Sequence, residues 1–124
     1  MKTIDVSAEV LAEFHRYEEA LVAGDLEVMG ELFADSPGLV RFGITDLQVG
    51  SAQVAEWRRH QPPLPAGRRL FDTRVMALGP DVAVVTTLFD YPGETSVGRQ
   101  SQTWQRMEEG WRVVHAHVSV VAGH

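Results

Sequence analysis

Two polar side chains lie among apolar positions of a predicted helix face or strand, and the first of these is Tyr17. It shares a stripe with Val10, Phe14 and Leu21, at spacings of four, three and four residues. This spacing is typical of one buried face of a helix. A buried tyrosine hydroxyl needs a hydrogen-bond partner, and in a pocket it can donate to an oxygen of a ligand. The alternative is a core tyrosine whose hydroxyl bonds to the backbone.

The second is Arg41, which separates Val40 from Phe42 in a short apolar segment. Alternation along a strand turns Arg41 to the face opposite its two neighbours. A guanidinium inside a pocket is costly unless it meets an anion, which it can bind through two hydrogen bonds. The sequence therefore predicts either an anion-binding arginine or an arginine in solvent.

The last predicted strand, residues 110–121, carries further polar side chains. Regular alternation along this strand predicts one face made of Trp111, Val113, His115, His117 and Ser119. Two imidazoles two residues apart suit a metal pair, but no third ligand accompanies them at a fixed spacing. A nucleophilic pair of Ser119 and His117 is a further alternative. We interpret His117 and Ser119 as polar residues lining one end of a pocket.

The preceding strand is unusually polar for a central strand. One of its faces carries Arg99, Ser101 and Thr103, and the other carries Gln100, Gln102 and Trp104. Whichever face is interior, the pocket contains hydrogen-bonding groups, which favours a polar ligand over a steroid-like one. Asp46, Asp72 and Asp90 are the candidate carboxylate bases, but each lies near a turn or among charged residues, so we interpret them as surface acids.

Composition excludes several functional classes. The formal net charge is −6, which repels nucleic acid and anionic lipid, and the short basic clusters 58–60 and 68–69 lack an accompanying recognition element. The absence of cysteine excludes disulfides, thiolate catalysis and cysteine-ligated zinc. No apolar stretch near the start suggests a signal peptide or a membrane span, so we expect a cytoplasmic protein.

The elements that must position these residues change character along the chain. Helical patterns cover residues 7–23, 25–33 and 52–60, short strands cover 39–42 and 47–49, and long strands cover 68–78, 82–90, 97–108 and 110–121. This order predicts an α+β fold, a single domain spanning residues 1–124. We expect a cone-like half-barrel, with the N-terminal helices packed on the concave face of a strongly curved, mainly antiparallel sheet, and a ligand pocket in the cone.

The order of elements, the Phe14-x-x-Tyr17 helix and the ending from Gly110 to Ser119 resemble the nuclear transport factor 2-like superfamily, which includes SnoaL-like and ketosteroid isomerase-like proteins. Val40-Arg41-Phe42-Gly43, Gly50 and the segment 98–104 resemble its AtzH-like branch. That branch takes its name from a decarboxylating amidohydrolase that acts on a dicarboxylated urea.

The resemblance implies a hydrolase acting on a polar, carboxylated urea-like or amide-like molecule, without a metal or an organic cofactor. It implies the catalytic residues Tyr17, Arg41, His117 and Ser119, and the substrate-binding residues Phe14, Phe42, Arg99, Gln100, Gln102 and Trp104. It also implies a homodimer through the outer sheet face, which would carry Val82, Val84, Thr86 and Leu88. The alternatives are a non-catalytic ligand-binding or dimerisation domain and, third, an isomerase, cyclase or dehydratase.

Overall fold

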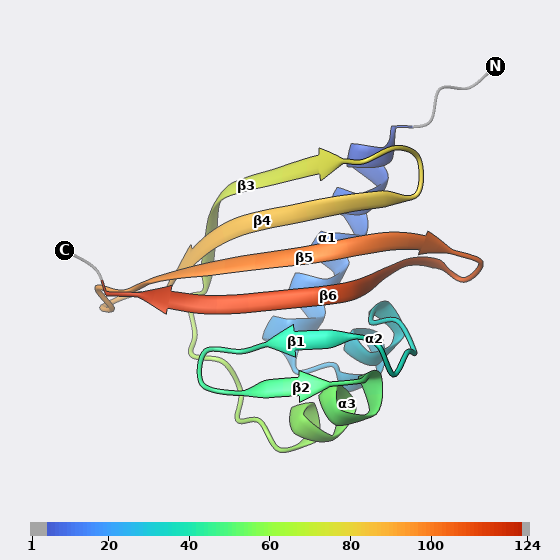
Figure 1. Cartoon of the computed structure of the whole chain (residues 1–124). Helices are drawn as coiled ribbons and strands as arrows, with labels where there is room; N and C mark the ends of the chain where they lie inside the picture. Colours follow the sequence, from blue (N-terminus) through green and yellow to red (C-terminus); the bar gives the residue numbers. More distant parts are fainter. Residues whose placement is uncertain (1–4, 123–124) are drawn as a thin grey trace.

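A computed structural model describes residues 5–122 and shows three helices against one face of a six-stranded sheet (Figure 1). The predicted boundaries agree with the observed ones to within one residue. The elements are α1 (Val6–Ala23), α2 (Leu26–Leu32), β1 (Val40–Phe42), β2 (Leu47–Val49), α3 (Ser51–Arg59), β3 (Arg69–Ala77), β4 (Val82–Asp90), β5 (Val97–Met107) and β6 (Gly110–Val121).

Local signals fix both ends of α1. The carboxylate of Asp5 accepts a hydrogen bond from the Ala8 backbone amide, which caps the start of the helix. Gly24 ends it in the left-handed conformation, with φ of 73°, which glycine adopts without steric cost. The predicted stripe is buried, since Val10, Phe14 and Tyr17 are at most 5% exposed.

The sheet has the strand order β2-β1-β6-β5-β4-β3, and it is not closed. All neighbouring strands are antiparallel except β1 and β6, which are parallel. The helices lie together behind the sheet in the view of Figure 1, so the sheet has one face toward them and one outer face. The predicted α+β class and the mainly antiparallel sheet are confirmed.

A β-bulge divides β6 into two parts. Thr103 pairs with His115 but Trp104 pairs with Val113, so Val114 is an extra residue in β6. The alternation of side chains changes phase at this point. The expectation of one continuous face is therefore wrong: Trp111 and Val113 lie in the core, whereas His115, His117 and Ser119 follow the bulge on the outer face.

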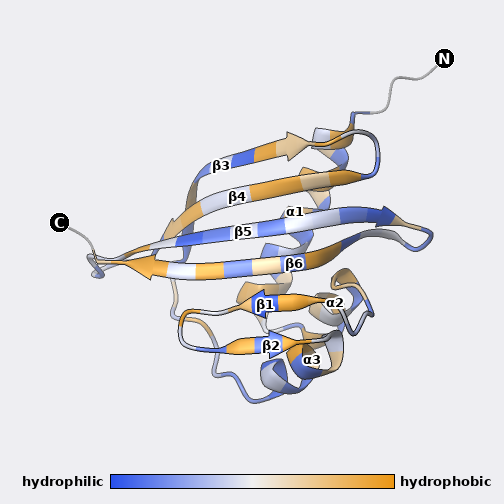
Figure 2. Ribbon diagram, in the orientation of Figure 1, coloured by the Kyte–Doolittle hydropathy of each residue, from blue (hydrophilic) through white to orange (hydrophobic). Residues whose placement is uncertain are grey.

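The core lies between the helices and the inner sheet face. Its largest fully buried side chains include Trp104, Phe14, Leu32 and Leu39. Hydropathy along the ribbon shows that β5 is more hydrophilic than its neighbour β4, although both are central strands (Figure 2). Polar side chains of β5 therefore extend beside the core. No helix among residues 5–122 is long and apolar enough to span a membrane.

Candidate ligand-binding cavity

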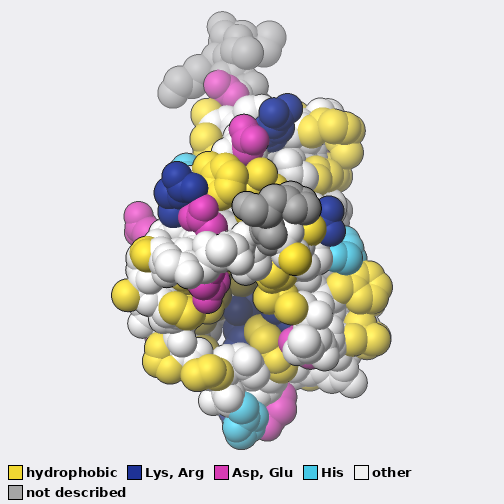
Figure 3. Space-filling view, turned by 90° about the vertical axis from the view of Figure 1, so that its left-hand side faces the viewer, with side chains coloured by type: hydrophobic (Ala, Val, Ile, Leu, Met, Phe, Trp, Pro, Cys, Tyr) yellow, Lys and Arg dark blue, Asp and Glu magenta, His cyan; other side chains and the backbone are white. Residues whose placement is uncertain are grey.

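One end of the inner sheet face is not filled by core side chains and forms a cavity of about 820 Å³. Its walls come from all three helices, from β1, β4, β5 and β6, and from the loop 61–65. Figure 3 shows a hollow on this side of the molecule, with Lys or Arg atoms at its bottom and hydrophobic side chains around it. This volume is in the range of small-molecule sites.

Arg41 enters the cavity wall from β1 and is 9% exposed. Its Nη1 atom donates to Asp46 Oδ1 at 2.7 Å and to Gln48 Oε1 at 2.8 Å, and its guanidinium stacks on the Trp57 ring at 3.8 Å. Burial lowers the pKa of Arg41, and Asp46 offsets only part of this effect. Arg41 therefore faces the cavity, which is one of the two orientations that the sequence left open, and it already has a carboxylate partner.

Arg58 enters from α3 and is 7% exposed. Its Nη2 atom donates to the Tyr17 hydroxyl at 2.8 Å, its Nη1 atom lies 3.3 Å from Met29 Sδ, and its guanidinium lies 4.6 Å from the centre of the Phe33 ring. Nε is buried, and no group among residues 5–122 accepts a hydrogen bond from it. No carboxylate in the described part of the chain pairs with Arg58. The cavity therefore contains a buried positive charge that no carboxylate among the described residues neutralises.

The Tyr17 side chain lies at the inner end of this arrangement. It is 5% exposed, lines the cavity, and its ring lies 5.6 Å from that of Phe33. Because its oxygen accepts the hydrogen bond from Arg58, its own proton is free to be donated elsewhere. Tyr17 and Arg58 together present hydrogen-bond donors to a group that accepts them.

A third buried arginine, Arg68, is neutralised by a network on the β5 side of the cavity. Its Nε donates to Glu18 Oε1 at 2.9 Å, and Gln100 Nε2 donates to Glu18 Oε2 at 3.0 Å. Burial alone would lower the pKa of Arg68, but the hydrogen bond and the charge of Glu18 outweigh it, so this pKa is raised. The Tyr91 hydroxyl accepts a further hydrogen bond from Arg68 at 3.2 Å. This network holds one wall of the cavity without adding net charge.

The structure divides the predicted site residues into two groups. Tyr17, Arg41, Gln100 and Gln102 line one cavity. The other six lie elsewhere: Phe14 and Trp104 are in the core, and Phe42, Arg99, His117 and Ser119 are on the outer sheet face.

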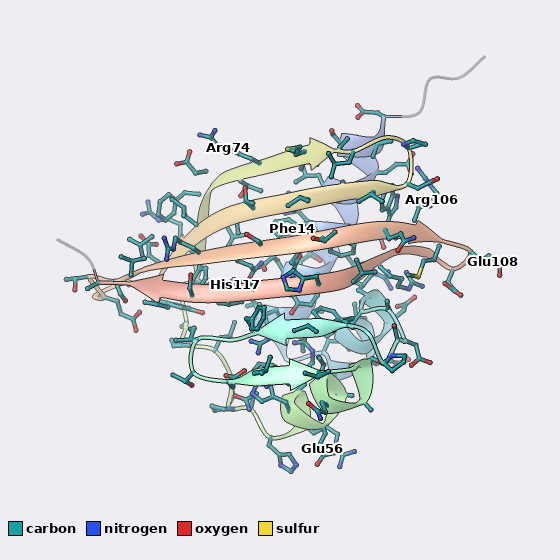
Figure 4. The ribbon with its side chains drawn as sticks, in the orientation of Figure 1. Phe14, Glu56, Arg74, Arg106, Glu108 and His117 are labelled. Atoms are coloured by element: carbon teal, nitrogen blue, oxygen red, sulfur yellow. The ribbon has the colours of Figure 1, made fainter. Side chains whose placement is uncertain are left out.

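The outer group makes its own contacts. Arg99 Nε donates to Ser119 Oγ at 3.3 Å, and the Phe42 and His117 rings are 5.7 Å apart. Figure 4 shows His117 on the sheet face turned away from α1. The physical reason is the bulge in β6, after which Ala116 and Val118 face the cavity and the residues between them face outward. The structure does not bring His117 or Ser119 together with Tyr17 and Arg41.

Sequence reasoning missed Arg58, Glu18 and Asp46. Arg58 belongs to the basic cluster 58–60, yet it follows Val54 by four residues and therefore shares the buried face of α3. Glu18 follows Phe14 by the same spacing on α1. Asp46, interpreted as a surface acid, is instead the partner of Arg41. The helical spacing of four residues could have identified Arg58 and Glu18 as buried. The pairing of Asp46 with Arg41 across the turn between β1 and β2 has no such signal in the sequence.

A metal centre is not indicated by the described side chains. Within residues 5–122, no three histidine, aspartate or glutamate side chains gather as a ligand set. The polar groups that do converge on the cavity are mainly nitrogen donors from arginine and glutamine. These suit an electron-rich organic group, such as a carboxylate, better than a cation.

The open sheet, the three helices on its inner face and the cavity between them define an NTF2-like protein. The chain belongs to the AtzH-like family, which matches residues 1–124. None of the proteins with curated descriptions matches the chain.

Solved structures support this classification. A cystatin-like fold protein from Burkholderia xenovorans LB400 is 42% identical, with a TM-score of 0.93 over 97% of this chain and 95% of that one. A protein of the DUF3225 family from Pectobacterium atrosepticum, described as having unknown function, is 41% identical, with a TM-score of 0.92 over 97% and 94%. A putative ketosteroid isomerase from Parabacteroides distasonis shares the fold at 17% identity, with a TM-score of 0.76 over 94% and 89%.

Proposed function

We propose that the cavity binds a small molecule through a carboxylate group, and that the chain hydrolyses a C–N bond of that carboxylated urea-like or amide-like molecule. The observation that carries the proposal is Arg58, a buried guanidinium on the cavity wall without a carboxylate partner among the described residues. Burying an unpaired charge is costly, and a bound carboxylate would compensate for it.

The other donors have complementary roles. Arg41, which is paired with Asp46, lines the same cavity, and the charge of Arg58 contributes to lowering its pKa, so an anion bound beside Arg58 favours the charged form of Arg41 as well. Tyr17, held by Arg58, donates a hydrogen bond to the carbonyl oxygen, which gains negative charge when the oxygen of water adds to the carbonyl carbon. The water gives up one proton as it adds. The C–N bond then breaks, its electron pair leaves with the nitrogen, and the nitrogen takes up that proton, while the carbonyl carbon keeps the oxygen from water.

A second candidate is a binding domain without catalysis, and one observation favours it. Hydrolysis benefits from a general base that activates water. Two carboxylates beside the donors are occupied, Asp46 by Arg41 and Glu18 by Arg68. A protein that binds carboxylates but does not turn over any of them would fit this arrangement.

Ammonia release separates the two candidates. Purified protein is incubated with small carboxylated ureas and amides, and Tyr17→Phe and Arg41→Met are assayed beside it. We expect release by the wild type, and a loss of about 10²- to 10³-fold in Tyr17→Phe, as when one oxyanion donor is removed. Carboxylate binding by calorimetry without any release from any compound would support the binding domain. Full activity in both variants would contradict the proposed roles.

A further inference from the structure

A row of paired residues crosses the sheet below the cavity. Arg41 of β1 pairs with Ala116 of β6, and Ala116 pairs with Gln102 of β5. Directly paired residues project from the same face of a sheet. All three line the cavity, so the methyl group of Ala116 lies on the floor between two long polar side chains. The two flanking strands are two interstrand spacings apart, about 10 Å.

The hydrogen bonds of Arg41 leave the space above Ala116 open. Arg41 leans away from β6, because its hydrogen-bond partners Asp46 and Gln48 lie on the β2 side. On the other side stands Gln102, which is 2% exposed and lines the cavity. A ligand held by the arginines can therefore extend over Ala116 toward Gln102.

The orientation of the Gln102 amide is fixed by Trp104. The indole Nε1 of Trp104 donates to Gln102 Oε1 at 3.1 Å, and an indole N–H is a donor only. The oxygen of the amide must therefore face Trp104, and its NH₂ group must face away. No partner of this NH₂ group is recorded among residues 5–122, and it is not among the fully buried unpaired atoms, so it reaches the cavity surface. Gln102 presents donors to the cavity and no acceptor.

We infer that Gln102 binds the uncharged carbonyl oxygen of the ligand, with the ligand lying over Ala116, so that the site selects carboxylates that carry an amide-type carbonyl a few bonds away. This inference rests on the proposed function, because the carboxylate must first be bound by the arginines. Trp104 is a positioning residue in this arrangement, since it acts only by orienting Gln102.

Two probe ligands of the same shape test the inference. Succinamate has a carboxylate and an amide, and 4-methylpentanoate replaces the amide oxygen and nitrogen with two methyl groups. Their dissociation constants are measured by titration calorimetry for the wild type, Gln102→Met, Trp104→Phe and Arg58→Met. Gln105→Met is the matched control, because Gln105 is an exposed glutamine of the same strand outside the cavity.

We expect Gln102→Met to shift the affinity ratio about tenfold toward 4-methylpentanoate, which corresponds to one hydrogen bond. Trp104→Phe shifts the ratio in the same direction by a smaller factor, because the amide can then turn its oxygen toward the ligand. Arg58→Met weakens both ligands alike, and Gln105→Met changes neither.

The failures of the two proposals are distinguishable. If both ligands bind the wild type and Gln102→Met leaves their ratio unchanged, Gln102 does not bind the carbonyl, and the carboxylate site stands. If neither ligand binds the wild type, the carboxylate site and this inference are both overturned. A measurement that needs no variant to fold is the ¹H–¹⁵N signal of the Gln102 side-chain amide in the wild type. It should move on addition of succinamate and not of 4-methylpentanoate, and an unmoved signal would overturn the inference.

Discussion

Replacing Arg58 with methionine should change stability and binding in opposite directions. Methionine keeps the unbranched shape of the side chain and removes the charge, which has no carboxylate partner among the described residues. If the buried charge is kept for a ligand, the ligand-free variant should be more stable than the wild type and should bind carboxylates poorly.

The expected magnitudes follow from the contacts of Arg58. Desolvating the guanidinium costs several kcal/mol, and its contacts with the Tyr17 hydroxyl and the Phe33 ring return part of that cost. A net gain of about 1 kcal/mol in the free energy of unfolding corresponds to a rise of about 3–5 °C in the melting midpoint of a domain of this size. Losing a charged hydrogen bond of about 2–3 kcal/mol corresponds to affinity weakened by about 30- to 150-fold.

Scanning calorimetry of the ligand-free protein and titration with succinamate measure the two effects. Arg74→Met serves as the control, since it also removes one positive charge but from an exposed side chain of β3 (Figure 4). The control should leave both the midpoint and the affinity close to those of the wild type. A lower midpoint for Arg58→Met combined with unchanged affinity would refute the reasoning.

Three further changes test the surrounding structure. Glu18→Gln leaves the buried Arg68 charge without a carboxylate and should lower the free energy of unfolding by about 3–5 kcal/mol in chemical denaturation, while adding Arg68→Met should recover much of the loss. The hydrogen bond from Arg106, together with the one from Trp111, holds the pKa of Glu9 below its ordinary value of 4.5. This interaction therefore stabilises the fold above that pH and is lost as the pH falls through the lowered pKa. Melting midpoints between about pH 5 and 3 should therefore fall more steeply for the wild type than for Glu9→Gln, and parallel curves would contradict this. Gly43→Ala would push a Cβ atom into the ion pair of Arg41 and Asp46, so it should lower both the melting midpoint and the affinity for succinamate. An unchanged affinity would show that the ion pair adjusts to the added atom.

Local pattern was sufficient for most of the fold. The stripe on α1 needed only helical periodicity and is confirmed, whereas strand periodicity left open whether Arg41 faces the cavity or solvent. Periodicity failed for His117 and Ser119 because the extra residue in β6 depends on pairing with β5, which one strand alone does not reveal.

The site was less accessible to sequence reasoning for a related reason. Arg58 and Arg59 are the same residue type at adjacent positions, yet one is buried beside Tyr17 and the other pairs with Glu56 at the surface. Only the packing of α3 against the rest of the fold separates them. The homodimer through Val82, Val84, Thr86 and Leu88 stays a prediction, which light scattering in solution can check.

The bulge in β6 also bears on how this strand can change in length during evolution. Val114 and His115 share one partner position on β5, so β6 has one residue more than the pairing requires. Removing Val114 would leave Val113 in the core and Ala116 under the ligand, because His115 already occupies the place opposite Thr103. A one-residue deletion here can therefore be absorbed without exchanging inner and outer side chains, whereas in a regular strand it would reverse them. The strand next to the cavity thus contains a point at which a one-residue deletion leaves the same side chains lining the pocket.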